Sequence, residues 1–150
     1  MSALLNRAIY FYEMSSEQMS KYSKKEINKD NDLACCIGYV LEQALELALK
    51  DLCGALAVEH PETHKLAVIL NAIRTGINRT NRLDLIHIVE LKTICDDILP
   101  DVRFYNNLAY GARYISDLKV DYGKLEKLDE ITSKILRIAK EVIKDWKQWI

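Results

Sequence analysis

The sequence predicts an all-α protein, an antiparallel bundle of about five helices. Two observations support this fold class. Gly and Pro are scarce, with 5 and 2 of 150 residues, and long stretches carry apolar residues at steps of three and four. The length and the 49% hydrophobic content are typical of one domain with one core, which we expect over residues 1–150.

The central element is a helix expected over residues 33–58. Its apolar residues recur as one broad stripe, formed by Leu33, Ile37, Val40, Leu41, Ala44, Leu45, Ala48, Leu49, Leu52 and Leu56. Glu42, Glu46 and Asp51 are expected mostly beside the stripe. Glu46 also precedes Lys50 by one turn, the favourable order for an ion pair on a helix. We expect the first, third and last helices to cover the stripe.

The remaining helices are placed by the same periodicity. They are expected over residues 2–23, 64–77, 83–99 and from 124 onward. The charged stretch 24–32 lacks the periodicity and is expected to be a connection. Thr63 is expected to cap the third helix and Gly76 to mark its end, while Pro100 ends the fourth. Residues 101–122, rich in aromatic side chains, are expected to form a short helix and an extended connection.

Charge and hydropathy narrow the function classes. Lys and Arg number 21 against 22 Asp and Glu, a net charge of -1. This balance argues against wholesale non-specific nucleic-acid binding but allows a local basic cleft. The chain opens without a cationic segment followed by an apolar run, and no stretch reaches the roughly 18 apolar residues of a membrane span. We therefore expect a cytoplasmic protein without membrane contact.

Cysteine and histidine spacing gives little support for metal or redox chemistry. No C-x-x-C pair occurs, and reduced, buried side chains are expected at Cys35, Cys36, Cys53 and Cys95. His60 and His64 have a metal-like spacing, but Pro61 breaks any helix between them and no third ligand is evident. Neither a metal nor a cofactor is predicted.

Three short motifs follow one another between Leu33 and Trp146. The central helix contains EQALELALKDL, the next segment reads HPETHKLAVIL, and GARYI follows the aromatic-rich region. In order and register they resemble the HEPN domains of bacteria and archaea, small helical bundles often encoded beside a minimal nucleotidyltransferase. Matching residues are Gln43, Ala44, Glu46, Leu49, Lys50, Pro61, Thr63, His64, Leu66, Ala112, Arg113 and Tyr114, whereas Ile115 stands where the family has Pro.

The resemblance implies a HEPN-like binding module. Such a module would partner a minimal nucleotidyltransferase in a toxin-antitoxin or nucleotide-binding system. A nucleotide or RNA would be bound through Arg113, Tyr114, Lys50 and His64. Arg113 is expected either to contact a phosphate, with Tyr114 stacking nearby, or to bridge carboxylates such as Glu42 across the bundle. The alternative role for His64 is structural, tying the third helix to the central one.

The resemblance also implies an alternative function, metal-independent cleavage of RNA by a toxin. Family nucleases use an Arg and a following His, with dimerisation bringing two such motifs together. Arg82 and His87 have the spacing, whereas no His follows Arg113. The His would act as general base or acid and the Arg would stabilise phosphate charge. Leu83 and Val89 occupy places where nucleases often have a polar residue and a Tyr. Structural roles are therefore the alternative: Arg82 would flank the start of a helix, and His87 would be a half-buried side chain.

A homodimer is expected from a surplus of apolar residues. Beyond the main stripes, the central and last helices carry further apolar side chains, at Cys36, Leu47, Ala55, Leu136, Ile143, Trp149 and Ile150. A two-fold interface allows such a patch to cover itself. We expect the last helix to contribute, with Trp146 and Trp149 closing the bundle end or a dimer contact. The groove between subunits would gather Arg113 or Arg82 from both chains.

Overall fold

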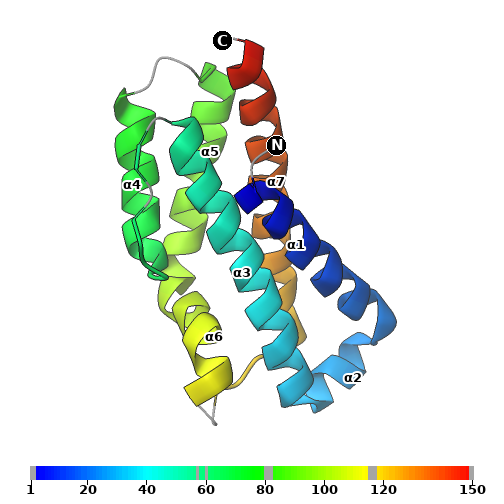
Figure 1. Ribbon diagram of the computed structural model, residues 1–150. Helices are drawn as coiled ribbons and strands as arrows, with labels where there is room; N and C mark the ends of the chain where they lie inside the picture. Colours follow the sequence, from blue (N-terminus) through cyan, green and yellow to red (C-terminus); the bar gives the residue numbers. More distant parts are fainter. Residues whose placement is uncertain (1–2, 57, 60, 80–82, 115–117, 149–150) are drawn as a thin grey trace.

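The computed structural model describes residues 3–56, 58–59, 61–79, 83–114 and 118–148, without the side chains of 111–114 and 143–148. Within these ranges all regular structure is helical, which confirms the all-α prediction (Figure 1). The elements are α1 (Ala3–Lys21), α2 (Lys24–Lys29), α3 (Asn31–Ala55), α4 (Leu66–Arg79), α5 (Leu85–Ile98), the 3-10 turn η1 (Leu99–Asp101), α6 (Val102–Tyr114) and α7 (Tyr122–Gln148). None of the helices in these ranges combines the length and hydropathy that a transmembrane span requires.

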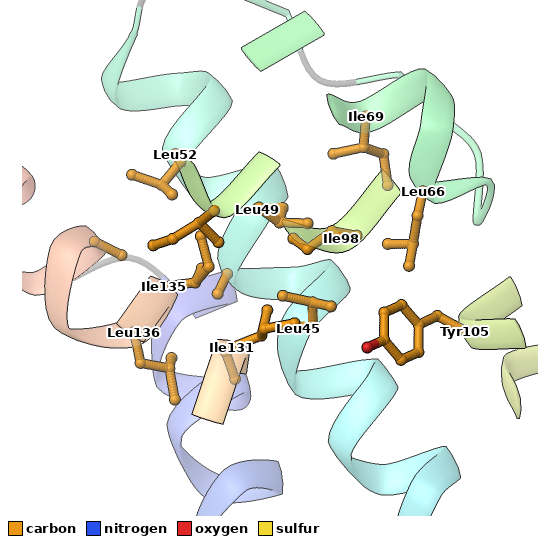
Figure 2. Packing of buried hydrophobic residues seen from close by; sticks show 14 of the residues in the cluster. Leu45, Leu49, Leu52, Leu66, Ile69, Ile98, Tyr105, Ile131, Ile135 and Leu136 are labelled. Atoms are coloured by element: carbon orange, nitrogen blue, oxygen red, sulfur yellow. The ribbon is translucent and has the colours of Figure 1, made fainter. Parts of the chain in front are cut away.

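Helix α3 lies at the centre of the bundle. It contacts α1, α7, α4 and α6, whereas α5 packs against α7 and α4 (Figure 1). The first, third and last helices therefore cover α3 as predicted, and α6 adds a further wall. Leu33 and Val40 are half-buried, and the other residues of the predicted stripe are buried. Figure 2 shows this core, with side chains that include Leu45, Leu49, Leu52, Leu66, Ile69, Ile98, Tyr105, Ile131, Ile135 and Leu136.

The charged residues of α3 are not placed as expected. Glu42, Glu46 and Asp51 are buried, at 0%, 1% and 9% exposure, instead of lying beside the stripe. The reason is that α1, α4, α6 and α7 all pack against α3, so little of its circumference reaches solvent. Carboxylates enclosed in this way need donors or cations close by.

The predicted connection over residues 24–32 is also wrong, because most of it is helical. Ser23 and Glu26 form a capping box: the Glu26 N–H donates to Ser23 Oγ at 3.1 Å, and the Ser23 N–H donates to Glu26 Oε1 at 3.3 Å. Asp30 then caps α3 by accepting from the Leu33 N–H at 3.1 Å. Local capping and the buried Ile27 replace the missing apolar periodicity.

Helix α4 differs from the prediction at both ends. Gly76 lies inside the helix, where an added Cβ would come within 2.8 Å of Leu56 Cβ, so its role is a close approach to the end of α3. Thr63 is not the N-cap, because its hydroxyl accepts from the Lys65 N–H ahead of the helix. The first helical N–H, of Leu66, instead donates to Asn106 Oδ1 of α6 at 3.1 Å. A side chain from a distant helix therefore caps α4.

The path from α5 to α7 follows the prediction. Helix α5 ends at Ile98, ahead of Pro100, and η1 leads into α6. The chain then returns to α7 through a segment held by Asn31. The Asn31 Nδ2 donates to the Leu118 carbonyl at 2.7 Å, and its Oδ1 accepts from the Val120 N–H at 2.9 Å. This clamp joins the start of α3 to the start of α7.

The predicted apolar surplus is only partly present. Ala55 and Leu136 are buried within the protomer and Leu47 is half-buried, so these three do not supply an exposed patch. Ile143, Trp146, Trp149 and Ile150 fall outside the described side chains. Exposed apolar side chains gather instead on one face of α5, at Leu85, Ile86 and Val89, with exposures of 75%, 70% and 54%.

The four cysteines divide into two kinds. Cys53 and Cys95 are buried as expected, and burial raises the pKa of each thiol to about 11. Cys35 is half-buried, and Cys36 is exposed, which corrects the prediction for that residue. Cys36 lines a groove between α1 and α3, together with Met14, Ile37 and Val40 among others.

Candidate functional site

A cleft of about 930 Å³ lies between α3, the segment before α4, and α6. This volume is in the range of small-molecule sites. Most of the lining residues have a polar group on their side chain; the lining comprises Tyr39, Gln43, Glu62, Thr63, His64, Lys65, Asn106, Asn107, Ala109 and Tyr110. Amides, tyrosine rings, one lysine and one histidine therefore converge from three segments that are far apart in the sequence.

Buried Glu46 holds the histidine of this cleft. The His64 Nδ1 lies 3.1 Å and 3.0 Å from the two carboxylate oxygens of Glu46, and Lys50 Nζ lies 3.4 Å from Oε2. The Glu46 side chain is 2% exposed and that of His64 79% exposed. Both His64 contacts use Nδ1, so Nε2 is the nitrogen with which His64 can meet a ligand. The predicted Glu46 and Lys50 pair and the predicted tie between His64 and the central helix are both present.

Glu42 lies one turn before Glu46 and is 0% exposed. Its Oε2 accepts from Gln43 Nε2 at 2.9 Å, while Oε1 has no hydrogen-bond partner among the described residues. Burial raises the pKa of the Glu42 carboxyl well above its usual range, and the negative charge of Glu46 raises it further. The bond from Gln43 and the charge of Lys50 act in the opposite direction. Burial therefore favours the neutral acid at Glu42. Lys50 forms its ion pair with Glu46.

The predicted binding residues fall into two groups. Lys50 and His64 meet at Glu46 next to the cleft. Arg113 and Tyr114 belong to the last turn of α6, and their side chains lie outside the described residues. Tyr110 lines the cleft and precedes Arg113 by three residues, so Arg113 follows the cleft wall at a distance of about one helical turn.

Several residues of the cleft lining lie outside the three family-like motifs. Tyr39 precedes Gln43 by one turn of α3, which places both on one face of the helix. Asn106 and Asn107 are adjacent in α6, where asparagine is a poor helix former. Two such residues inside a helix indicate a task other than helix formation. This was the signal in the sequence from which these two site residues could have been predicted. The task visible for Asn106 is capping α4.

His87, the predicted catalytic histidine, lies elsewhere, between α5 and α7. Its Nε2 lies 2.7 Å from Glu141 Oε2 and its Nδ1 3.0 Å from Asp84 Oδ1, with the side chain 10% exposed. The hydrogen bond with His87 holds the pKa of the Glu141 carboxyl below its usual range, and Arg137 contributes in the same direction. Arg82 lies outside the described residues. Both ring nitrogens of His87 thus lie beside carboxylates, in a contact that joins two helices.

Comparison with known proteins gives one match. No curated protein and no solved structure matches the chain significantly. The family model of the HEPN domain matches residues 1–149, nearly the entire sequence.

Proposed function

Because this chain belongs to the HEPN domain family, we propose that it is a non-catalytic module that binds a nucleotide, free or within RNA, in the cleft between α3 and α6. One observation carries the proposal. Gln43 from the first family-like motif and Thr63 and His64 from the second line the same cleft. Because His64 is 79% exposed while only its Nδ1 contacts buried Glu46, its Nε2 can meet a ligand in the cleft.

The lining residues suit the parts of a nucleotide. Tyrosine rings such as Tyr39 and Tyr110 can stack on a base, which has a flat π-face whatever its identity. The amides of Gln43 and Asn106 supply hydrogen-bond donors and acceptors for base edges. Lys65 offers a cation for a phosphate. Arg113, one turn beyond Tyr110, is proposed to add a second cation.

Metal-independent cleavage of RNA by Arg82 and His87 is the competing function. General acid–base catalysis needs a ring nitrogen that can exchange a proton with the substrate. In His87 the two nitrogens lie 2.7 Å from Glu141 and 3.0 Å from Asp84. This geometry favours the binding role over the catalytic one.

The binding proposal is tested by titration calorimetry with adenosine monophosphate and the full chain. Lys65→Ala removes a cation of the cleft and should weaken binding about tenfold, as expected for a charge-assisted contact. Lys134→Ala removes an exposed lysine from α7 and serves as the matched control with unchanged affinity. Equal losses in both variants, or no binding by the wild type, would contradict the proposal.

The catalytic alternative is tested separately, by incubating RNA with the protein and a chelator. We expect no cleavage. Chelator-resistant cleavage that disappears in His87→Ala, while the variant keeps its helical circular dichroism, would establish the alternative function.

We further propose a homodimer that uses the exposed α5 face formed by Leu85, Ile86 and Val89, which lies on the helix that contacts α7. Dimerisation is common in the family, and a two-fold contact would cover these side chains. Val89→Glu should give a monomer of about 17.3 kDa in sedimentation velocity at micromolar concentration. Val68→Glu, on α4 and 44% exposed, is the matched control. A wild-type protein that sediments only as a monomer would contradict the proposal.

The protein partner is proposed from the family alone. The test is co-expression with the minimal nucleotidyltransferase encoded nearest to the gene. Elution of both chains in one peak during size-exclusion chromatography is expected. Separate elution would remove this partner without affecting the nucleotide proposal.

A further inference from the structure

We infer that the cleft accepts a nucleotide with a single phosphate, either a nucleoside monophosphate or one nucleotide of a single strand, and discriminates against nucleoside di- and triphosphates. The inference rests on the proposed nucleotide-binding function and concerns the charge that the cleft can accommodate. Two independent observations support it: the balance of charged side chains and the state of the helix start at the cleft wall.

The charged side chains of the cleft lining nearly cancel. Lys65 is the one lysine of the described lining and Glu62 the one carboxylate. Behind them, Lys50 already lies 3.4 Å from the buried Glu46. The protonated form of His64 would add a single positive charge. Together with the cation proposed at Arg113, this charge can balance a single phosphate, which carries at most about two negative charges, but not the additional charges of a di- or triphosphate.

Two backbone donors at the start of α4 are already occupied. Polyphosphate sites use bare backbone N–H groups at a helix start or in a loop before it. Here the Lys65 N–H donates to Thr63 Oγ1 at 3.1 Å and the Leu66 N–H donates to Asn106 Oδ1 at 3.1 Å. The protein's own side chains thus occupy donors that a phosphate chain would need.

The remaining surface suits a base better than further phosphates. Asn106 turns its Oδ1 to Leu66, so Nδ2 is its atom for donating to a ligand. Gln43 donates through Nε2 to Glu42 Oε2 at 2.9 Å, so Oε1 is its atom for accepting. A donor on α6 and an acceptor on α3 match the neutral edge of a nucleobase, which offers both.

Titration calorimetry without divalent cations tests this directly, with adenosine mono-, di- and triphosphate and a four-nucleotide adenylate strand as probes. We expect the monophosphate or the strand to bind about tenfold or more tightly than the triphosphate. Binding of the strand alone assigns the ligand to nucleic acid, and equal binding of the monophosphate assigns it to free nucleotides. Triphosphate affinity equal to or above that of the monophosphate overturns the inference while the proposed function stands. No binding by any probe overturns the proposed function itself.

Two variants test the cause. Glu62→Gln removes the cleft carboxylate, so the gap between mono- and triphosphate should narrow severalfold, whereas Glu130→Gln on exposed α7 surface should leave it unchanged. Asn106→Asp keeps the oxygen that accepts from Leu66 but adds a negative charge, so all probes should bind at least tenfold more weakly. An unchanged gap in Glu62→Gln would contradict the charge argument.

Discussion

Two histidines of the described residues pair with glutamates, in opposite arrangements. At the cleft, the carboxylate of Glu46 is buried and His64 is exposed, with side-chain exposures of 2% and 79%. Between α5 and α7, His87 is buried and Glu141 is exposed, with values of 10% and 45%. In the first pair a fixed carboxylate aims a histidine at the cleft. In the second pair, the exposed carboxylates of Glu141 and Asp84 lie beside the buried ring of His87. The contact with Glu141 joins α5 to α7.

The burial of each partner determines which side chain of the pair can reach a ligand. A ring held through Nδ1 by a rigid partner keeps one nitrogen for a ligand, as at His64. A ring whose two nitrogens both lie beside carboxylates can stabilise the fold, as we propose for His87. The residue type and its spacing to an arginine do not distinguish these cases, whereas the burial of each partner does.

The largest expected effect tests the core that supports both pairs. Leu45 of α3 is 0% exposed and lies in the centre of the cluster in Figure 2. Leu45→Ala should lower the free energy of unfolding by about 2 to 5 kcal/mol, because it removes buried apolar atoms and leaves a cavity. Chemical denaturation measures this loss. A change below about 0.5 kcal/mol would mean that this face of α3 is not enclosed.

A smaller effect separates the two histidines. His87→Ala should destabilise the protein by about 1 to 3 kcal/mol, since it removes a buried ring and its contacts with Glu141 and Asp84. His64→Ala should cost less, about 1 kcal/mol or below, because its side chain is 79% exposed and Lys50 still pairs with the buried Glu46 carboxylate. Urea unfolding of both variants gives the comparison. A larger loss of stability in His64→Ala than in His87→Ala would contradict the difference between the two pairs.

The two glutamate environments should also differ in pH dependence. Burial raises the pKa of the Glu42 carboxyl, so its contribution to stability is complete below about pH 4.5 and is lost as the pH rises through the raised pKa. Hydrogen bonding to His87 lowers the pKa of Glu141, so its contribution is present above about pH 4.5 and is lost on acidification.

Thermal unfolding of two isosteric variants tests this contrast. Relative to the wild type, Glu42→Gln should gain stability as the pH rises from about 5 to 8, because the amide cannot ionise in the core. Glu141→Gln should lose stability at neutral pH and approach the wild type in acid. Parallel pH profiles for both variants would show that the carboxylates do not differ as described.

The smallest effect is expected at the edge of the His87 contact. Arg137 of α7 is 49% exposed and pairs with Glu90 and Glu141. Arg137→Ala should cost less than about 1 kcal/mol, and the loss should shrink further in high salt, because solvent screens exposed pairs. A loss as large as that of His87→Ala would mean that the arginine, and not the buried ring, holds the two helices together.

Most helices were predictable from the sequence because periodic burial is a local signal. The predictions were wrong where another interaction replaced that signal: the capping box of Ser23 and Glu26 forms α2, and Gly76 allows a close contact inside α4. Glu42 and Glu46 were predicted to lie outside the core, since the pattern of one helix does not reveal how many neighbours surround it.

The site was predictable only in part for a similar reason. Family-like motifs singled out His64 and Lys50, and both meet at Glu46. The partner of His87 is Glu141, which lies 54 residues away, and Asn106 caps a helix that starts 40 residues before it. Such pairings arise from the tertiary arrangement, and no spacing in the sequence signals them.

We propose that His64, and not His87, faces the bound nucleotide. The most direct test is nuclear magnetic resonance of the ¹⁵N-labelled histidine rings during titration with adenosine monophosphate, with His64→Ala and His87→Ala used to assign the signals. The His64 Nε2 signal should shift with added nucleotide, while both His87 nitrogens stay where they are. A shift confined to the His87 signals would contradict the claim and return function to the α5 side of the molecule.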